Sequence, residues 1–214
     1  MTTPPFPPVS DADLAVMREQ LGRPARGVVG IAARCVCGNP TVAATAPRLP
    51  DGTPFPTFYY LTHPAATAAM SVLEADHVMR ELQDSLAEDD GLRAAYARAH
   101  EAYLSDRAQF GDVGEIAGIS AGGMPTRVKC LHALAAHALA AGPGVNPIGD
   151  RALELSAWSP SRCSCAVPGA AGDSAARAGS GSSARAASDA AGSADADSAA
   201  RAASDPSPGA EGAG

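Results

Sequence analysis

Long apolar runs, aromatic side chains and basic residues are all scarce in this chain of 214 residues. No run of about 18 consecutive strongly apolar residues occurs, so we expect no membrane-spanning helix. Residues 1–8 have neither a basic segment nor an apolar core, and we expect no secretory signal. The formal net charge of −7 argues against nonspecific nucleic-acid binding, which needs a basic surface. These absences predict a cytoplasmic protein.

Large apolar side chains nearly disappear toward the C-terminus. Val167 is the only one after Cys165, whereas alanine, serine and glycine dominate. Such a segment cannot bury enough apolar surface to offset the entropy lost on ordering. We therefore expect a flexible N-terminus over residues 1–9, one domain over 10–158 and a disordered, acidic Ala/Ser/Gly-rich tail over 159–214. The charged tail offers a segment for a protein partner.

Hydrophobic periodicity divides the predicted domain into a β-rich part and a helical part. Ser10 and Asp13 form a capping box, which predicts a first helix as far as Leu21. The β-prone runs are 27–34, 41–45 and 55–62, and the helix-like segments are 64–87, 91–110, 125–141 and 146–158. This order predicts an α+β fold with about three mostly antiparallel strands and four to five helices.

The five cysteines include no Cys-x2-Cys pair, the spacing of many zinc sites. In a reducing cytoplasm, cysteines bind metal, react or pack in the core. Zinc takes four nitrogen or sulfur ligands, and four such side chains lie near the ends of predicted elements. The predicted zinc ligands are Cys35, His63, Cys130 and His132.

Four other interpretations of these residues stay open. His137 could replace His132 as a ligand, or the cysteines and histidines could simply pack in the core. Cys35 and Cys37 could bind a metal together with Cys163 and Cys165, although a one-residue spacer is awkward for two ligands. A nucleophilic Cys–His pair is the fourth, and no nucleophile signature accompanies it.

A glycine-rich segment followed by basic residues predicts an anion site. Gly122 and Gly123 precede a predicted helix whose first turn carries Arg127 and Lys129, and Arg34 and Arg48 could add to the patch. Exposed amides, a helix N-terminus and cations together favour a phosphate or carboxylate. The alternative is a glycine-rich hinge with solvated basic side chains.

One face of the predicted helix 91–110 carries Tyr96, His100, Tyr103 and Arg107 at helical spacing. An interface with the sheet explains this spacing without any function, and a cleft-lining face explains it equally well.

Five segments resemble the bacterial "domain of unknown function 501" family: Arg26–Cys35, Pro47–Thr57, Tyr60–Pro64, Gly122–His132 and Gly142–Asp150. The resemblance extends over about residues 11–155. It implies Cys or His at the position of His63, which suits metal ligation, and no fixed residue at the position of Cys37. It establishes no activity. It implies that the gene lies beside genes for a septum-formation initiator and an exopolyphosphatase-like enzyme.

Two functional classes fit these expectations. In one, a zinc ion lies beside an anion or phosphate pocket and acts on a small anionic ligand. In the other, the domain is a non-catalytic structural or interaction module, linked to cell division or septum formation, with its Cys and His residues in the core.

Overall fold

The computed structural model describes residues 4–165. Three strands form an antiparallel sheet in the order β1-β2-β3: β1 (Val28–Arg34), β2 (Pro40–Thr45) and β3 (Tyr59–Leu61). The helices are α1 (Asp11–Leu21), α2 (Pro64–Ala75), α3 (Val78–Glu88), α4 (Asp90–Ala108), the short 3-10 helix η1 (Gly114–Ile116), α5 (Leu131–Ala141) and α6 (Pro147–Leu155). The predicted α+β class is confirmed. None of the helices in residues 4–165 is long and apolar enough to cross a membrane.

Two predicted helices differ from the structure. The segment 64–87 forms two helices, because His77 adopts a left-handed conformation with a φ of 63° between α2 and α3. The helix expected from Pro125 begins only at Leu131. Residues 122–129 instead fold back on themselves, with the amide of Lys129 donating to the carbonyl of Gly122 at 2.8 Å. Side chains at Gly122 and Gly123 would collide with α5 and with the backbone of Arg127, so both positions need glycine.

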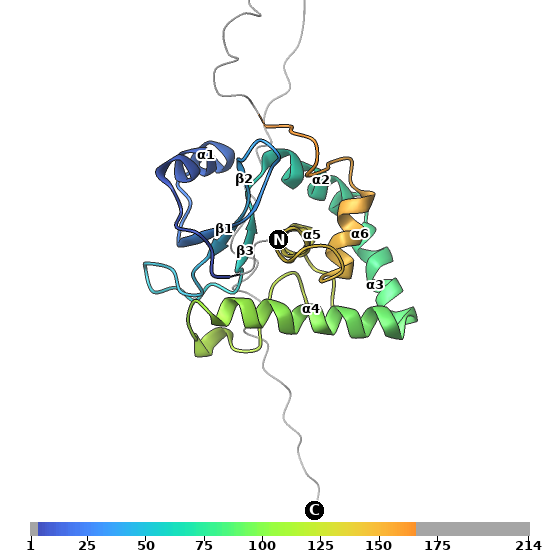
Figure 1. Cartoon of the computed structure of the whole chain (residues 1–214). Helices are drawn as coiled ribbons and strands as arrows, with labels where there is room; N and C mark the ends of the chain where they lie inside the picture. Colours follow the sequence, from blue (N-terminus) through green and yellow to red (C-terminus); the bar gives the residue numbers. More distant parts are fainter. Residues whose placement is uncertain (1–3, 166–214) are drawn as a thin grey trace, which may run out of the picture. The chain divides into compact units, whose positions relative to one another are not determined.

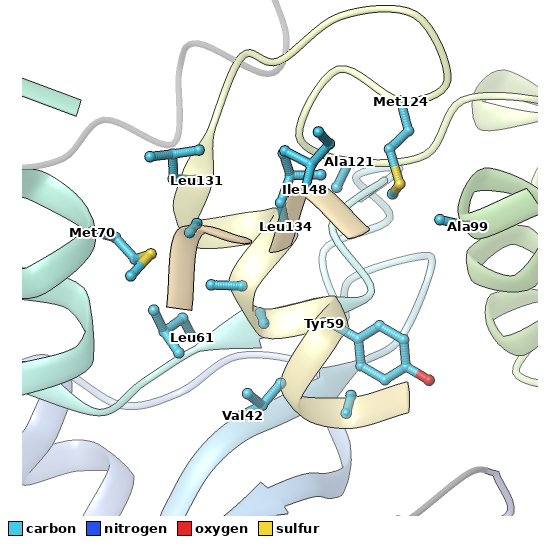
Figure 2. Close-up of a cluster of buried hydrophobic side chains, with 14 of the residues drawn as sticks. Val42, Tyr59, Leu61, Met70, Ala99, Ala121, Met124, Leu131, Leu134 and Ile148 are labelled. Atoms are coloured by element: carbon cyan, nitrogen blue, oxygen red, sulfur yellow. The ribbon is translucent and has the colours of Figure 1, made fainter. Parts of the chain in front are cut away.

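The sheet lies between two helices that cover its opposite faces. On one face, Met17 of α1 packs against Ile31 and Ala43. On the other, α5 lies at the centre of the larger core, with the sheet on one side and α2 and α6 on the other (Figure 1). Figure 2 shows Val42 and Tyr59 of the strands beside this central helix. Most residues of α5 are thus enclosed by the core.

Helix α1 is fixed to the sheet by one buried carboxylate. Asp13 completes the predicted capping box with Ser10 and also accepts from the guanidinium of Arg34 at 2.6 Å. The hydrogen bond from Arg34 lowers the pKa of Asp13 to about 2. Arg34 is thereby committed to α1 and does not extend the predicted anion patch.

The polar face of α4 is structural. Tyr96, His100, Tyr103 and Arg107 are all buried, and each hydrogen-bonds to a loop that precedes a strand or helix. Their partners are the carbonyl groups of Pro56, Ile116, Ile119 and Arg127, the hydroxyl of Ser120, and the amides of Phe58 and Tyr59, which donate to the hydroxyl of Tyr103. Of the two interpretations of this face, an interface with the sheet or a lining of a cleft, the interface explains these contacts. The face holds the segments 56–59 and 116–127 in place.

The folded unit extends beyond the predicted limits of 10 and 158. At the N-terminal end, Phe6 stacks on Phe110 with ring centroids 5.7 Å apart and also packs against Phe58. At the C-terminal end, Cys165 contacts Cys37 and His63. A single aromatic ring and two cysteines in low-complexity surroundings give too little periodicity to be recognised as part of a core. Of the tail expected over 159–214, residues 166–214 lie outside the described residues.

A close helix contact joins α5 and α6. An added Cβ at Gly149 would collide with the carbonyl oxygen of Leu134, which the rigid backbone of α5 holds in place. We therefore expect Gly149→Ala to lower the free energy of unfolding by about 2 kcal/mol or more, in the range of overpacked cores. Gly114→Ala is the matched control, since a Cβ there has nothing within 4 Å. Chemical denaturation of both variants measures the difference, and equal stabilities would contradict the assigned contact.

Candidate metal centres and a cationic groove

Four cysteines converge on one point at the edge of the sheet. Cys35 and Cys37 lie in the turn between β1 and β2, and Cys163 and Cys165 come from the segment after α6. Their Sγ atoms all lie within 4.8 Å of one another, and Cys37 and Cys165 are 3.5 Å apart. All four are free thiols, with Cys35 buried and Cys37 exposed. We call this group the four-cysteine cluster.

Backbone amides support the four-cysteine cluster in the same way on both arms. The amide of Asn39 hydrogen-bonds to the sulfur of Cys37, two residues back, and lowers the pKa of that thiol to about 7. The amide of Cys165 likewise bonds to Cys163, again two residues back. Such N–H···S bonds are the outer-shell contacts that stabilise thiolate ligands.

Cys163 and Cys165 resist ionisation beside Cys37, whose own pKa the neighbouring thiols lower. Burial and the neighbouring Cys37 raise the pKa of Cys165 to about 12. Cys163 receives a favourable bond from the amide of Cys165, but the thiol of Cys37 opposes it, and the pKa of Cys163 is also raised. Crowded thiols can all lose their protons only when a cation compensates the accumulated negative charge. The cluster could therefore hold a metal ion.

His63 is a neighbour of the four-cysteine cluster. It is buried at the N-terminus of α2, where Nδ1 accepts from the amide of Ala66 at 3.4 Å. Nε2 therefore carries the hydrogen and lies 3.2 Å from the sulfur of Cys165. In this tautomer His63 donates to a cysteine of the cluster, and burial lowers its pKa. His63 thus supports the cluster from outside the group of four sulfurs.

The four predicted zinc ligands are divided between two places. Cys35 belongs to the four-cysteine cluster and His63 contacts it, whereas Cys130 and His132 form a second group with Glu74. The cysteines that come together are those of the two Cys-x-Cys pairs, which the sequence analysis regarded as awkward because of their one-residue spacers. Each spacer lies in a tight turn or irregular segment, a geometry that spacing alone does not reveal.

The second group lies where α2 meets the start of α5. Cys130 is the N-cap residue of α5 and His132 is in its first turn, whereas Glu74 is near the end of α2. Nδ1 of His132 is 3.1 Å from Oε1 of Glu74 and 3.9 Å from the sulfur of Cys130. All three side chains are half-buried. We call this group the Glu–Cys–His cluster.

The surroundings of the Glu–Cys–His cluster fix the orientation of the imidazole. Nε2 of His132 lies 3.1 Å from the carbonyl of Thr67, which can only accept, and 3.2 Å from the hydroxyl of Ser71, which can also accept, so Nε2 carries a hydrogen. Nδ1 is then left facing the carboxylate of Glu74, which also accepts from the amide of Leu131 at 2.7 Å. Burial lowers the pKa of His132, but the hydrogen bonds with Cys130 and Glu74 outweigh it and raise the pKa to about 10. Nδ1 thus binds a proton strongly when no other cation is present.

The predicted anion residues also separate. Arg127 and Lys129 line an open groove beside α3, which we call the cationic groove, with a cavity volume of about 480 Å³. Gly122 and Gly123 do not line it, and Arg48 pairs with Glu115 at 2.7 Å. Arg80 of α3 is a third cation in the groove, which the sequence did not single out because it lies on a separate helix.

The predicted alternative ligand His137 lies in the core. It is fully buried, stacked on Tyr59 with an interplanar angle of 11° and edge-on to Tyr103. Its Nδ1 faces the amide nitrogen of Asn146 at 3.1 Å, and that amide's oxygen accepts from Gly149. Nδ1 is therefore an acceptor, and protonating it would place two donors face to face. His137 contributes to packing and to neither cluster.

The fold and its side-chain clusters define an α+β protein with two groups that could hold a metal ion. A family model described as "Protein of unknown function (DUF501)" matches residues 31–154, more than half of the 214 residues. The chain belongs to this family, as its sequence resemblance predicted. The match includes the whole Glu–Cys–His cluster and ends before Cys163. No curated protein and no solved structure matches the chain.

Burial makes His137 a source of acid sensitivity, because it lowers the pKa of this imidazole to about 4. A histidine with a lowered pKa stabilises the fold fully above its unfolded value of about 6.5, and this contribution is lost as the pH falls. Between pH 7 and pH 4 we expect a loss of about 3 kcal/mol from this group.

The test compares the free energy of unfolding of wild type and His137→Phe across this pH range. The phenyl ring keeps the stacking on Tyr59 but does not titrate. Both proteins retain every cysteine, so acid effects on the thiols cancel in the comparison. A variant with the same pH slope as wild type would show that His137 is not responsible.

Proposed function

We propose that the chain is a zinc-binding protein and that the four-cysteine cluster holds a structural zinc ion. The observation that carries the proposal is the convergence of two Cys-x-Cys pairs, one from the β1–β2 turn and one from the segment after α6. Structural zinc sites are closed, with four protein ligands in a tetrahedron. The supply of four thiols in one place, with one sulfur of each pair bonded to a backbone amide, supports this class of site.

The sulfur positions suit zinc. With Zn–S bonds of about 2.3 Å, a tetrahedral site places its sulfurs about 3.8 Å apart. The separation of Cys37 and Cys165 is 3.5 Å, and the whole cluster spans at most 4.8 Å between any two sulfurs. Thiolates also select iron, so the metal must be identified directly. A reducing cytoplasm, which we propose as the location, keeps such thiols available.

A closed site of this kind supports a structural role rather than catalysis at the four-cysteine cluster. Bound zinc would hold Cys163 and Cys165 on the β1–β2 turn. The segment that carries these cysteines follows Trp158, a buried residue that packs beside His63 with ring centroids 5.5 Å apart. Metal binding and folding of this end of the molecule are therefore expected to be coupled.

The test is metal analysis of Cys163→Ser/Cys165→Ser beside Ser164→Ala, which changes the intervening residue and no ligand. The double variant should lose about one equivalent of zinc relative to wild type and melt at a lower temperature, because structural zinc contributes directly to folding. The Ser164→Ala protein should keep both properties. Equal zinc contents in wild type, the double variant and Ser164→Ala would reject the zinc centre. Disulfides that persist in the intact mass of wild type after treatment with a reductant would also reject it.

We further propose that the cationic groove binds a small anion that bears a phosphate group. Arg80, Arg127 and Lys129 are exposed at its rim, and none of its lining residues is acidic. Within residues 4–165, these three cations make no ion pair, although several other arginines do. The floor contains Met79 and Val128. Cations around an apolar floor suit an organic phosphate.

The wall of the groove is held in place by Gln83. Its side-chain nitrogen donates to the carbonyl of Thr126 at 3.2 Å, and its oxygen accepts from the amide of Val128 at 2.9 Å. These two bonds attach the segment with Arg127 and Lys129 to α3, which carries Arg80. The relative positions of the cations therefore do not depend on a bound ligand, and this lowers the entropic cost of binding.

Phenyl phosphate and inorganic phosphate are the probes for the groove, with titration calorimetry as the measurement. Arg127→Ala/Lys129→Ala should weaken phenyl phosphate binding by about tenfold or more, because each charged hydrogen bond contributes about 1.5–3 kcal/mol. Arg18→Ala removes an exposed arginine of α1 and should leave the affinity unchanged. Absent binding to wild type, or equal losses in Arg18→Ala, would reject the groove as an anion site.

A further inference from the structure

We propose that Glu74, Cys130 and His132 form a second metal site, with three protein ligands and an open coordination position, for a divalent ion of the zinc class. The three ligand atoms lie within 4.8 Å of one another, at the junction of α2 and α5. The proposal concerns a different set of residues from the four-cysteine cluster and stands without it. Its chemistry also differs, because one sulfur, one nitrogen and one oxygen replace four sulfurs.

The distances between ligand atoms agree with a common ion. Zinc bonds of about 2.1 Å to nitrogen and oxygen and about 2.3 Å to sulfur, at tetrahedral angles, separate nitrogen from oxygen by about 3.4 Å and nitrogen from sulfur by about 3.6 Å. In the Glu–Cys–His cluster, Nδ1 of His132 is 3.1 Å from Glu74 and 3.9 Å from Cys130. Small side-chain rotations would therefore bring all three atoms to bonding distance.

The surrounding hydrogen bonds are those of a preorganised ligand set. A metal-binding histidine usually donates its other ring hydrogen to a carbonyl or carboxylate, which fixes the tautomer. Here Nε2 of His132 lies 3.1 Å from the carbonyl of Thr67, and Nδ1 is left for a cation. Oε1 of Glu74 is similarly held by the amide of Leu131 at 2.7 Å. Both ligands are thus oriented by backbone groups of two helices.

The alternative explanation is an ion pair between His132 and Glu74, in which a proton occupies the place of the metal. An ion pair needs only these two groups and gives no reason for a thiol to face the same ring nitrogen. Cys130 does so from the N-cap position, where it makes no capping bond to the helix backbone. The third ligand is therefore the feature that distinguishes a metal site from a helix-to-helix salt bridge.

The fourth position would be open to solvent. The side chains of His132 and Glu74 are 26% and 25% exposed, so water reaches the cluster. Sites with three protein ligands keep a water or substrate in the fourth position, and the metal lowers the pKa of that water. Lys129, which lines the cationic groove, is the residue before Cys130. An anion in the groove would thus contact a residue adjacent in sequence to a ligand of the open metal.

The experiment separates this site from the four-cysteine cluster. Cobalt(II) is titrated into Cys163→Ser/Cys165→Ser, in which the four-cysteine cluster is disabled, and the visible spectrum and metal content are measured. We expect about one remaining equivalent of cobalt, with the weaker sulfur charge-transfer band of a single thiolate ligand. Adding Cys130→Ser to this protein should remove the band. A background protein that binds no cobalt would overturn the second site.

Two further variants separate loss of the second metal site from loss of folding and from failure of the four-cysteine proposal. Glu74→Gln keeps an oxygen for the amide of Leu131 but removes the charge, and should weaken cobalt binding by about tenfold or more. Cys130→Ser/His132→Gln in the otherwise unchanged chain should lose about one equivalent of zinc and keep the metal of the four-cysteine cluster. If it retains the wild-type zinc content, the second site is wrong whatever the four-cysteine cluster binds. Circular dichroism confirms that each variant is folded.

Discussion

Burial of α5 on nearly all sides is the constraint on which the rest of the structure depends. Most of its residues are fully buried, and they contact all three strands, α2 and α6. Its side chains are mainly alanine, so neighbouring backbones approach closely, and Gly149 of α6 lies directly on the carbonyl of Leu134. Figure 2 shows Leu134 of α5 beside Ile148 of α6. A helix of small residues in the centre gives dense packing and no room for adjustment.

This constraint also positions the chemistry. Since the body of α5 cannot shift, its first turn has a fixed place against α2, and Cys130 and His132 meet Glu74 there. The segment before α5 is held by Gln83 and by the hydroxyl of Tyr96, which donates to Arg127. The cationic groove and the Glu–Cys–His cluster therefore lie on consecutive parts of one immobilised stretch of chain.

Much of the fold could be predicted from the sequence because it follows local rules. The capping box at Ser10, the hairpin around Gly38 and the proline that begins α2 are each signalled within a few residues. The break at His77 could not, because nothing in the neighbouring sequence forces a non-glycine residue into a left-handed conformation. The late start of α5 also depends on contacts with Gln83 that no local pattern contains.

The candidate site was predicted as a set of residue types rather than as an arrangement. Three of the four proposed zinc ligands belong to metal-type clusters and the fourth contacts one, but they are divided between two places. Glu74 was not among the predicted ligands, because its role depends on α2 crossing the start of α5. Arg80 was missed because it lies on α3, a helix distant in sequence from Arg127 and Lys129. Spacing along the chain identifies reactive side chains, whereas their grouping depends on how distant helices cross.

The position of the four-cysteine cluster has a consequence for the unfolded state. Cys37 and Cys165 are 128 residues apart in sequence, so an ion bound to both would close a loop that contains β2, β3 and the helices from α2 to α6. In the chain-entropy model, a covalent cross-link around a loop of about 100 residues stabilises the fold by about 4.7 kcal/mol at 25 °C, because it lowers the entropy of the unfolded chain. A metal bridge here would act as a disulfide does in secreted proteins. Unlike a disulfide, its contribution to the free energy of unfolding would rise with the concentration of the metal.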